Sequence, residues 1–102
     1  MGFTAARVSG ATVTSTADSA TVVTLAAAKA TRAGLWIQNS STEILFVKMG
    51  DTATVADYSV EIPARTATGA TLWEMPTTPI YTGIVTGIWA NNSTGAAKVT
   101  EF

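Results

Sequence analysis

The chain of 102 residues contains no histidine and no cysteine. Without histidine it lacks the commonest general base near neutral pH and the most frequent metal ligand. Without cysteine it can form neither disulfides nor thiolate metal sites, and a nucleophile would have to be Ser, Thr or Lys, activated without an imidazole. We therefore expect a protein that is not an enzyme and that binds no cofactor and no metal ion.

Charged side chains are also scarce. Asp, Glu, Lys and Arg make up 13% of the residues, against about 25% in ordinary soluble domains, and the formal net charge is −1. No basic cluster is present, so neither a nucleic acid nor an anionic membrane surface is an expected partner. No apolar run approaches ~20 residues, and the first residues lack the apolar stretch of a signal peptide, so we expect neither a membrane span nor a signal peptide.

The acidic residues are scattered, and only Asp51 and Asp57 flank one predicted loop. Together with backbone carbonyls they could hold Ca²⁺, but a calcium loop usually offers a denser set of oxygen ligands. Asp is also a common turn residue because its carboxylate accepts hydrogen bonds from its own backbone. Turn formation is therefore the favoured interpretation of both residues.

Short runs of alternating or β-branched residues recur along the whole chain. Thr and Ala supply roughly a third of the residues, and Thr suits the polar face of a strand without adding charge. The helix-favouring stretch, residues 26–31, is too short for more than a turn or two. The pattern predicts strands at residues 11–16, 21–25, 35–38, 43–49, 57–62, 70–75, 81–90 and 96–102.

Seven to eight short strands separated by Gly, Pro and Asn turn signals predict an all-β protein, an antiparallel β-sandwich or small barrel. We expect a single domain at residues 11–102, preceded by an N-terminal arm at residues 1–10. The short polar segment 39–42 predicts that strands 35–38 and 43–49 form an antiparallel hairpin.

The cleanest alternation lies at residues 57–62. It predicts that Tyr58, Val60 and Ile62 point into the core, whereas Ser59 and Glu61 point outwards.

Several predicted strands are apolar on both faces, although an antiparallel sandwich needs only one apolar face per strand. The second face must be covered either by the chain's own arm and loops or by another subunit. Under the second interpretation, the predicted interface residues are Phe3, Trp36, Ile44, Phe46 and Trp73.

The aromatic residues allow another interpretation, a platform on which sugar rings stack. Each of them lies within an apolar strand, which favours a place in the core or in an interface. The residues in question are Trp36, Trp73, Trp89, Tyr58 and Tyr81.

Six segments between residues 32 and 101 resemble, in order, the small β-sandwich virion proteins of tailed bacteriophages. They are RAGLWIQNSS (32–41), ILFVKMG (44–50), DYSVEI (57–62), EMP (74–76), YTGIVTGIW (81–89) and GAAKVTE (95–101). The resemblance carries no catalytic residues and implies a structural role in the virion. The expected function is that of a capsid decoration (cement) protein, and the alternative is a tail or fibre module that binds a host-surface glycan.

For a decoration protein, the expected location is the outer surface of the capsid. The expected partners are the major capsid protein and further copies of the chain itself, with the arm and the surplus apolar faces buried against neighbours. A homotrimer is expected because icosahedral shells offer threefold sites, so this expectation depends on the resemblance. A glycan is a partner only under the alternative.

Overall fold

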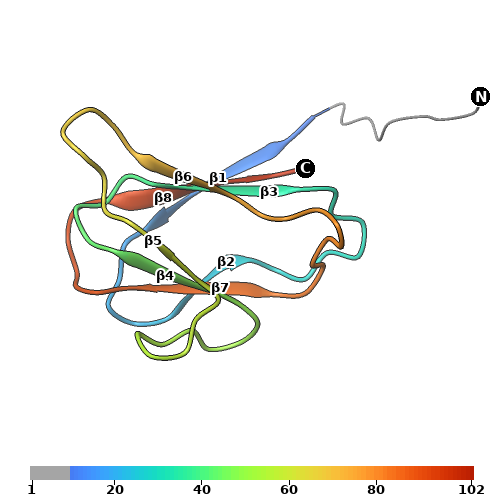
Figure 1. Cartoon of the computed structure of the whole chain (residues 1–102), viewed down its shortest axis with the longest axis horizontal. Coiled ribbons are helices and arrows are strands. Elements are labelled where there is room, and N and C mark those ends of the chain that lie inside the picture. The colour runs from blue at the N-terminus through green and yellow to red at the C-terminus, as the bar shows by residue number, and fades with distance from the viewer. Residues whose placement is uncertain (1–9) are drawn as a thin grey trace, which may run out of the picture.

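A computed structural model describes residues 10–102 as eight antiparallel β-strands in two four-stranded sheets, with no helix in this range (Figure 1). The predicted fold class, an all-β antiparallel sandwich, is confirmed. The strands are β1 (Thr12–Ala17), β2 (Val23–Ala26), β3 (Leu35–Asn39), β4 (Leu45–Met49), β5 (Val60–Ile62), β6 (Thr71–Glu74), β7 (Val85–Trp89) and β8 (Ala96–Glu101).

The two sheets form the two layers of the sandwich. Sheet A has the strand order β1-β8-β3-β6, and sheet B has the order β2-β7-β4-β5. Figure 1 shows sheet A above sheet B, with β5 and β6 on the same side of the molecule. Of the predicted N-terminal arm, residues 1–9 lie outside the described residues, and Phe3 is among them.

The core fills the space between the inner faces of the two sheets. Because side chains alternate along a strand, every second residue of the central strands points inwards. Leu35 and Ile37 of β3 face Leu45 and Val47 of β4, and all four are fully buried. Trp89 of β7 is also fully buried, and its indole Nε1 donates a hydrogen bond of 3.1 Å to the side-chain oxygen of Asn39.

The predicted hairpin between residues 35–38 and 43–49 is wrong. β3 pairs with β6 and β8 in sheet A, whereas β4 pairs with β5 and β7 in sheet B. The connecting segment crosses between the sheets because the buried Asn39 amide anchors it. Its Nδ2 donates to the carbonyls of Glu43 at 2.9 Å and Pro63 at 3.1 Å, and its Oδ1 accepts from the backbone N–H of Ser41 at 3.1 Å.

The alternation predicted for residues 57–62 holds in part. Ile62 is buried, Val60 is half-buried, and both Ser59 and Glu61 are exposed, as predicted. The placement of Tyr58 in the core is wrong, since 39% of this residue is exposed. The strand β5 begins only at Val60, and the chain bends before it, so the inward and outward pattern does not extend back to Tyr58.

Candidate interaction surface

Residues 10–102 enclose no pocket, and they contain no group of three or more acidic side chains that could hold a metal ion. Within the same range, no helix has the length and hydropathy needed to cross a membrane. Asp57 forms an ion pair with Lys48, and its backbone N–H donates to the hydroxyl of Thr54 at 2.8 Å. These contacts account for Asp57 as a loop residue.

The buried side chain of Asp18 holds three loops together at one end of the sandwich. Asp18 accepts hydrogen bonds from the hydroxyl of Ser41 at 2.6 Å, from the backbone N–H of Ser93 at 3.0 Å and from that of Gly95 at 3.1 Å. Its carboxylate thereby joins three loops that are far apart in the sequence. Because each of these contacts fixes a loop, Asp18 has a structural role.

Arg32 has a corresponding role at the other end. Its guanidinium is fully buried and donates to Glu101 Oε2 at 2.7 Å, to the carbonyl of Ala27 at 2.7 Å, and to those of Tyr81 at 2.8 Å and Gly83 at 3.0 Å. Within the described residues, no buried side-chain nitrogen or oxygen lacks a hydrogen-bond partner. The buried polar side chains of residues 10–102 are therefore all engaged in contacts within the fold.

The outer face of sheet B is covered by the chain's own loop between β4 and β5. The hydroxyl of Thr86, on the outer side of β7, donates to the carbonyl of Gly50 at 2.7 Å and accepts from the N–H of Ala53 at 3.1 Å. Ala53 is 1% exposed, and the ring of Tyr58 packs on Phe46 with a centroid distance of 4.9 Å. Figure 1 shows this loop beneath the strands of sheet B.

The outer face of sheet A has no such cover among the described residues. The strand register aligns Val13, Thr100, Trp36 and Glu74 in one row across the four strands, and Ser15, Lys98, Gln38 and Leu72 in the next row. Directly paired residues share a face of the sheet. Three large apolar residues on this face are exposed, namely Val13 at 61%, Leu72 at 51% and Trp36 at 42%.

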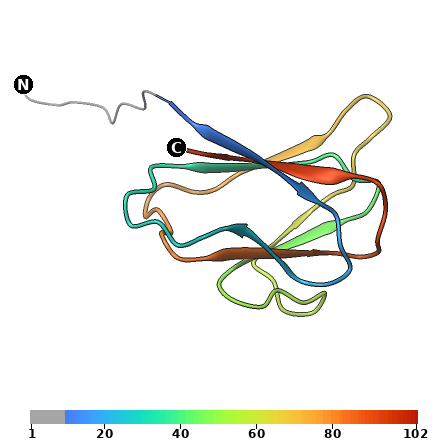
Figure 2. The same ribbon diagram turned by 180° about the vertical axis from the view of Figure 1, so that it is seen from behind.

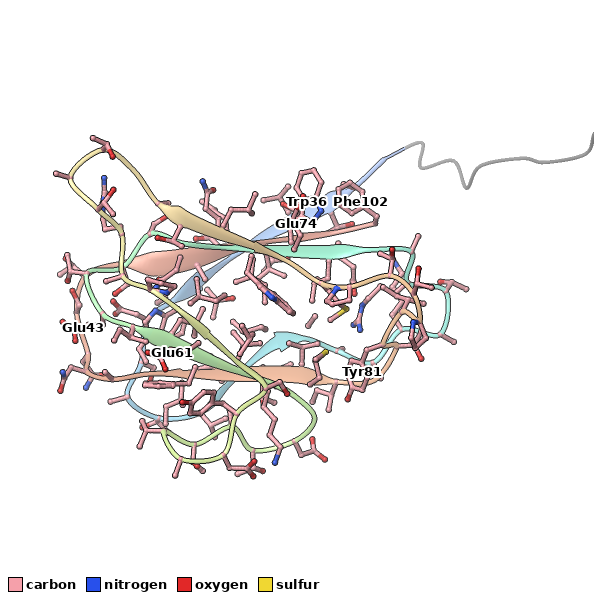
Figure 3. The ribbon with its side chains drawn as sticks, viewed as in Figure 1. Trp36, Glu43, Glu61, Glu74, Tyr81 and Phe102 are labelled. Atoms are coloured by element: carbon pink, nitrogen blue, oxygen red, sulfur yellow. The ribbon has the colours of Figure 1, made fainter. Side chains whose placement is uncertain are left out.

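Trp36 lies beside Phe102 on this face. Its ring meets the ring of Phe102 edge to face, with a centroid distance of 4.9 Å. Figure 3 shows Trp36, Glu74 and Phe102 close together on the side of sheet A that points away from sheet B. The two rows described above mix apolar residues with polar ones, and their charged residues, Lys98 and Glu74, have opposite signs.

The structure does not bring the predicted interface residues together. Trp36 lies on the outer face of sheet A, whereas Phe46 lies on the outer face of sheet B beneath Tyr58. Trp73 is half-buried and packs against the core, because it pairs with the inward-pointing Ile37. Ile44 is half-buried immediately before β4.

Three residues of the outer face of sheet A were missed in the sequence, namely Val13, Leu72 and Phe102. A signal for Leu72 was present, because it neighbours Trp73 on a strand and must point to the opposite face. An inward Trp73 therefore requires an outward Leu72. Val13 had no such signal, since it lies between threonines on a strand with little apolar character.

The five aromatic residues considered as a sugar platform do not form one. Trp89 is fully buried, and Trp73 and Tyr81 are half-buried. The Tyr81 hydroxyl donates to the carbonyl of Ile84 at 2.9 Å. Tyr58 and Trp36 are exposed on opposite sides of the sandwich, so no two of the exposed rings share a surface.

No protein-family model, no curated protein and no solved structure matches this chain. The features that bear on function are therefore the contrast between the two outer faces and the sequence resemblance of residues 32–101.

Proposed function

We propose that this protein is a structural module that attaches to a larger protein assembly through the outer face of sheet A. Following the sequence resemblance, we take the assembly to be the head of a tailed bacteriophage. The protein is then a decoration protein that binds the major capsid protein on the outer surface of the head and stabilises the shell.

The observation that carries this proposal is the difference between the two outer faces. The β4–β5 loop packs on sheet B, although Val55 and Tyr58 of this loop are exposed, whereas on sheet A the exposed apolar residues Val13, Trp36 and Leu72 belong to the strands themselves. Exposed apolar residues that lie together on one face are typical of an interaction site. No described segment covers the outer face of sheet A in this way, and a second protein would bury its exposed apolar residues.

The chemistry of this face suits a protein surface. The cores of protein interfaces are enriched in aromatic residues. The face presents Trp36 beside Phe102, and its charged residues in the paired rows are Lys98 and Glu74. One lysine gives no basic stripe along which a phosphate backbone could bind.

The alternative, a tail or fibre module that binds a glycan, is supported by one observation. Trp36 presents an exposed ring with Glu74 paired beside it, and a sugar can stack on such a ring and hydrogen-bond to such a carboxylate. The remaining exposed aromatic residue, Tyr58, lies on the opposite side. The rings of Trp36 and Phe102 meet edge to face and so do not form one flat platform for a sugar, which makes attachment to a protein the better-supported function.

The mechanism of a decoration protein requires no catalysis. A molecule that binds the assembled shell but not its separated subunits stabilises the assembled state by mass action. At a hundredfold excess of free protein over the dissociation constant, the gain is about 2.7 kcal/mol per site. Many sites on one shell make the total effect large.

The test is binding to heads assembled from the major capsid protein of the same phage genome. Purified protein is sedimented with these heads, and two variants with matched exposure are compared. Trp36→Ser removes the aromatic residue that is 42% exposed on sheet A, and Tyr58→Ser removes the one that is 39% exposed over sheet B. Loss of an interface hot spot costs about 2 kcal/mol or more, which corresponds to roughly thirtyfold weaker binding.

We expect Trp36→Ser to weaken binding to heads at least about thirtyfold and Tyr58→Ser to leave it within about twofold. Equal effects of the two substitutions would contradict docking through sheet A. If the wild-type protein binds glycans on an array but not heads, the decoration role is wrong and the tail or fibre role is supported.

A further inference from the structure

The edge of sheet A formed by β1 differs from the other three sheet edges. Natural proteins protect edge strands from pairing with other chains by shortness, charge, proline or bulges. β5 has three residues and is followed by Pro63, β6 has four residues and ends at Glu74, and the pairing of β2 shifts register between Thr24 and Ala26. Each of these edges therefore has at least one protective feature.

β1 has none of these features. It is six residues long, its sequence TVTSTA contains no charge, proline or glycine, and its pairing with β8 is regular throughout. Five of its residues are exposed and Thr16 is half-buried, so neither face of the strand is well covered. In Figure 2, β1 lies nearest to the viewer, and no other described segment crosses in front of it.

One hydrogen bond shows which backbone groups of β1 point towards β8 and which point to the other side, the free edge of the sheet. The N–H of Asp18 donates to the carbonyl of Gly95 at 3.0 Å, and this pair continues the β1–β8 register. Because backbone groups alternate in direction along a strand, those of Thr12, Thr14 and Thr16 point towards β8. The N–H and C=O groups of Val13, Ser15 and Ala17 therefore point away from the sheet, three donors and three acceptors on one edge.

We propose that β1 pairs with β1 of a second copy of this chain, antiparallel about a two-fold axis at Ser15. With Ser15 opposite its own counterpart, Val13 lies opposite Ala17 of the other copy, and all six free backbone groups find partners. If the register between the two copies shifted by one residue, backbone groups that point to the free edge would lie opposite groups that point towards β8. A shift of two would leave the groups of one end residue, Ala17 or Val13 according to its direction, without a partner in β1.

A second copy suits this edge in two further ways. The strand carries no charge, so no like charges face each other when it pairs with itself. On the inner face Thr14 lies opposite Thr16 of the other copy, a pair whose hydroxyl groups can hydrogen-bond across the strands. The two-fold contact also uses the edge of both copies, so the assembly closes at two and does not grow into a fibre.

The pairing would join the two copies of sheet A into one sheet of eight strands. The outer faces that carry Trp36 would then lie side by side on a continuous surface. This inference does not depend on the proposed function, because it concerns the strand edge and not the outer face. It differs from the trimer that the sequence resemblance implies, and the mass in solution distinguishes two copies from three.

The test uses the full chain and two substitutions at one position. Ser15→Pro removes an N–H that points to the free edge, and it leaves the hydrogen bonds to β8 in place. Ser15→Thr changes the side chain but keeps the N–H, so it is the matched control. Sedimentation equilibrium measures the mass of each protein, and circular dichroism checks that each retains its β-sheet spectrum.

We expect the wild-type protein and Ser15→Thr to have twice the mass of the chain, and Ser15→Pro to have the mass of a single chain with an unchanged spectrum. A wild-type protein that remains a monomer up to millimolar concentration would overturn the proposal, and a strand of another protein would then be the remaining partner for this edge. A trimer would overturn it too, as would a dimer that survives Ser15→Pro.

A cysteine provides a second test, which does not depend on how well Ser15→Pro folds. The chain has no cysteine of its own, so a single Ser15→Cys substitution reports one contact. Facing residues in an antiparallel pair have Cα atoms about 4.5–5.5 Å apart, within the range of about 4.4–6.8 Å that a disulfide needs. Thr68→Cys, in an exposed turn, is the control.

On mild oxidation, Ser15→Cys should form a covalent dimer at least about tenfold faster than Thr68→Cys. Equal rates for the two variants would show that Ser15 does not lie at a two-fold axis.

Discussion

Replacing Arg32 with alanine should destabilise the fold by about 3–5 kcal/mol, because it removes one partner of a buried ion pair. The guanidinium of Arg32 is fully buried, and the carboxylate side chain of Glu101 is 20% exposed. The same guanidinium also donates to the three backbone carbonyls of Ala27, Tyr81 and Gly83. The substitution therefore leaves a shielded negative charge and three carbonyl groups without their donors.

The expected loss is a large part of the stability of such a domain. A protein of this size has a free energy of unfolding of about 5–15 kcal/mol, and each kcal/mol lost lowers the melting temperature by about 4–8 °C. Arg32→Ala should thus melt at least about 12 °C below the wild-type protein. Arg32→Lys should recover only part of this loss, because one ammonium group cannot reach all four acceptors.

The assay is urea unfolding followed by far-UV circular dichroism, with Arg65→Ala as the control. Arg65 is exposed, and its contact to the carbonyl of Thr66 is 3.5 Å long. This control should change stability by no more than about 0.5 kcal/mol. If Arg32→Ala and Arg65→Ala had the same effect, the buried network around Arg32 would not be a source of stability, and the reasoning would be refuted.

Two further substitution pairs test the packing of the sandwich by the same urea assay. Ile62→Ala should cost about 2–5 kcal/mol and Glu61→Ala less than about 0.5 kcal/mol, because Ile62 is 1% exposed and Glu61 points outwards; similar costs would contradict the orientation of β5. Gly95→Ala should lower the free energy of unfolding by at least about 1–3 kcal/mol, because the new Cβ would lie close to the backbone of Ser41. Gly10→Ala, with open space around the new Cβ, should change it little. A neutral Gly95→Ala would contradict the close approach of the two loops.

The strands could be predicted from the sequence because alternation is a local property. The buried face of β3 follows directly from the alternation of Leu35, Trp36 and Ile37. The pairing of strands could not be predicted in the same way. A short polar segment such as residues 39–42 is equally suited to reversing the chain within one sheet and to crossing between two sheets. The buried Asn39 amide decides between them through contacts with Pro63 and Trp89, which are remote in the sequence.

The interaction surface was predictable only in part, for a similar reason. Trp36 and Phe46 both lie on strands with two apolar faces, and both were expected to contact a partner. The loop between β4 and β5 covers Phe46 with Tyr58, and no corresponding loop of the described residues covers Trp36. Whether an outward apolar residue is covered depends on where a distant loop folds, and the pattern of a single strand does not contain that information.

If, as we propose, the outer face of sheet A attaches the protein to a phage head, a cryo-electron microscopy reconstruction of heads incubated with the protein should show it. We expect density for the sandwich at symmetry-related sites of the outer surface, with Trp36 and Leu72 against the shell and the loop between β4 and β5 towards solvent. Density in which that loop contacts the shell and Trp36 faces solvent would refute docking through sheet A, and heads without any bound protein would refute the decoration role.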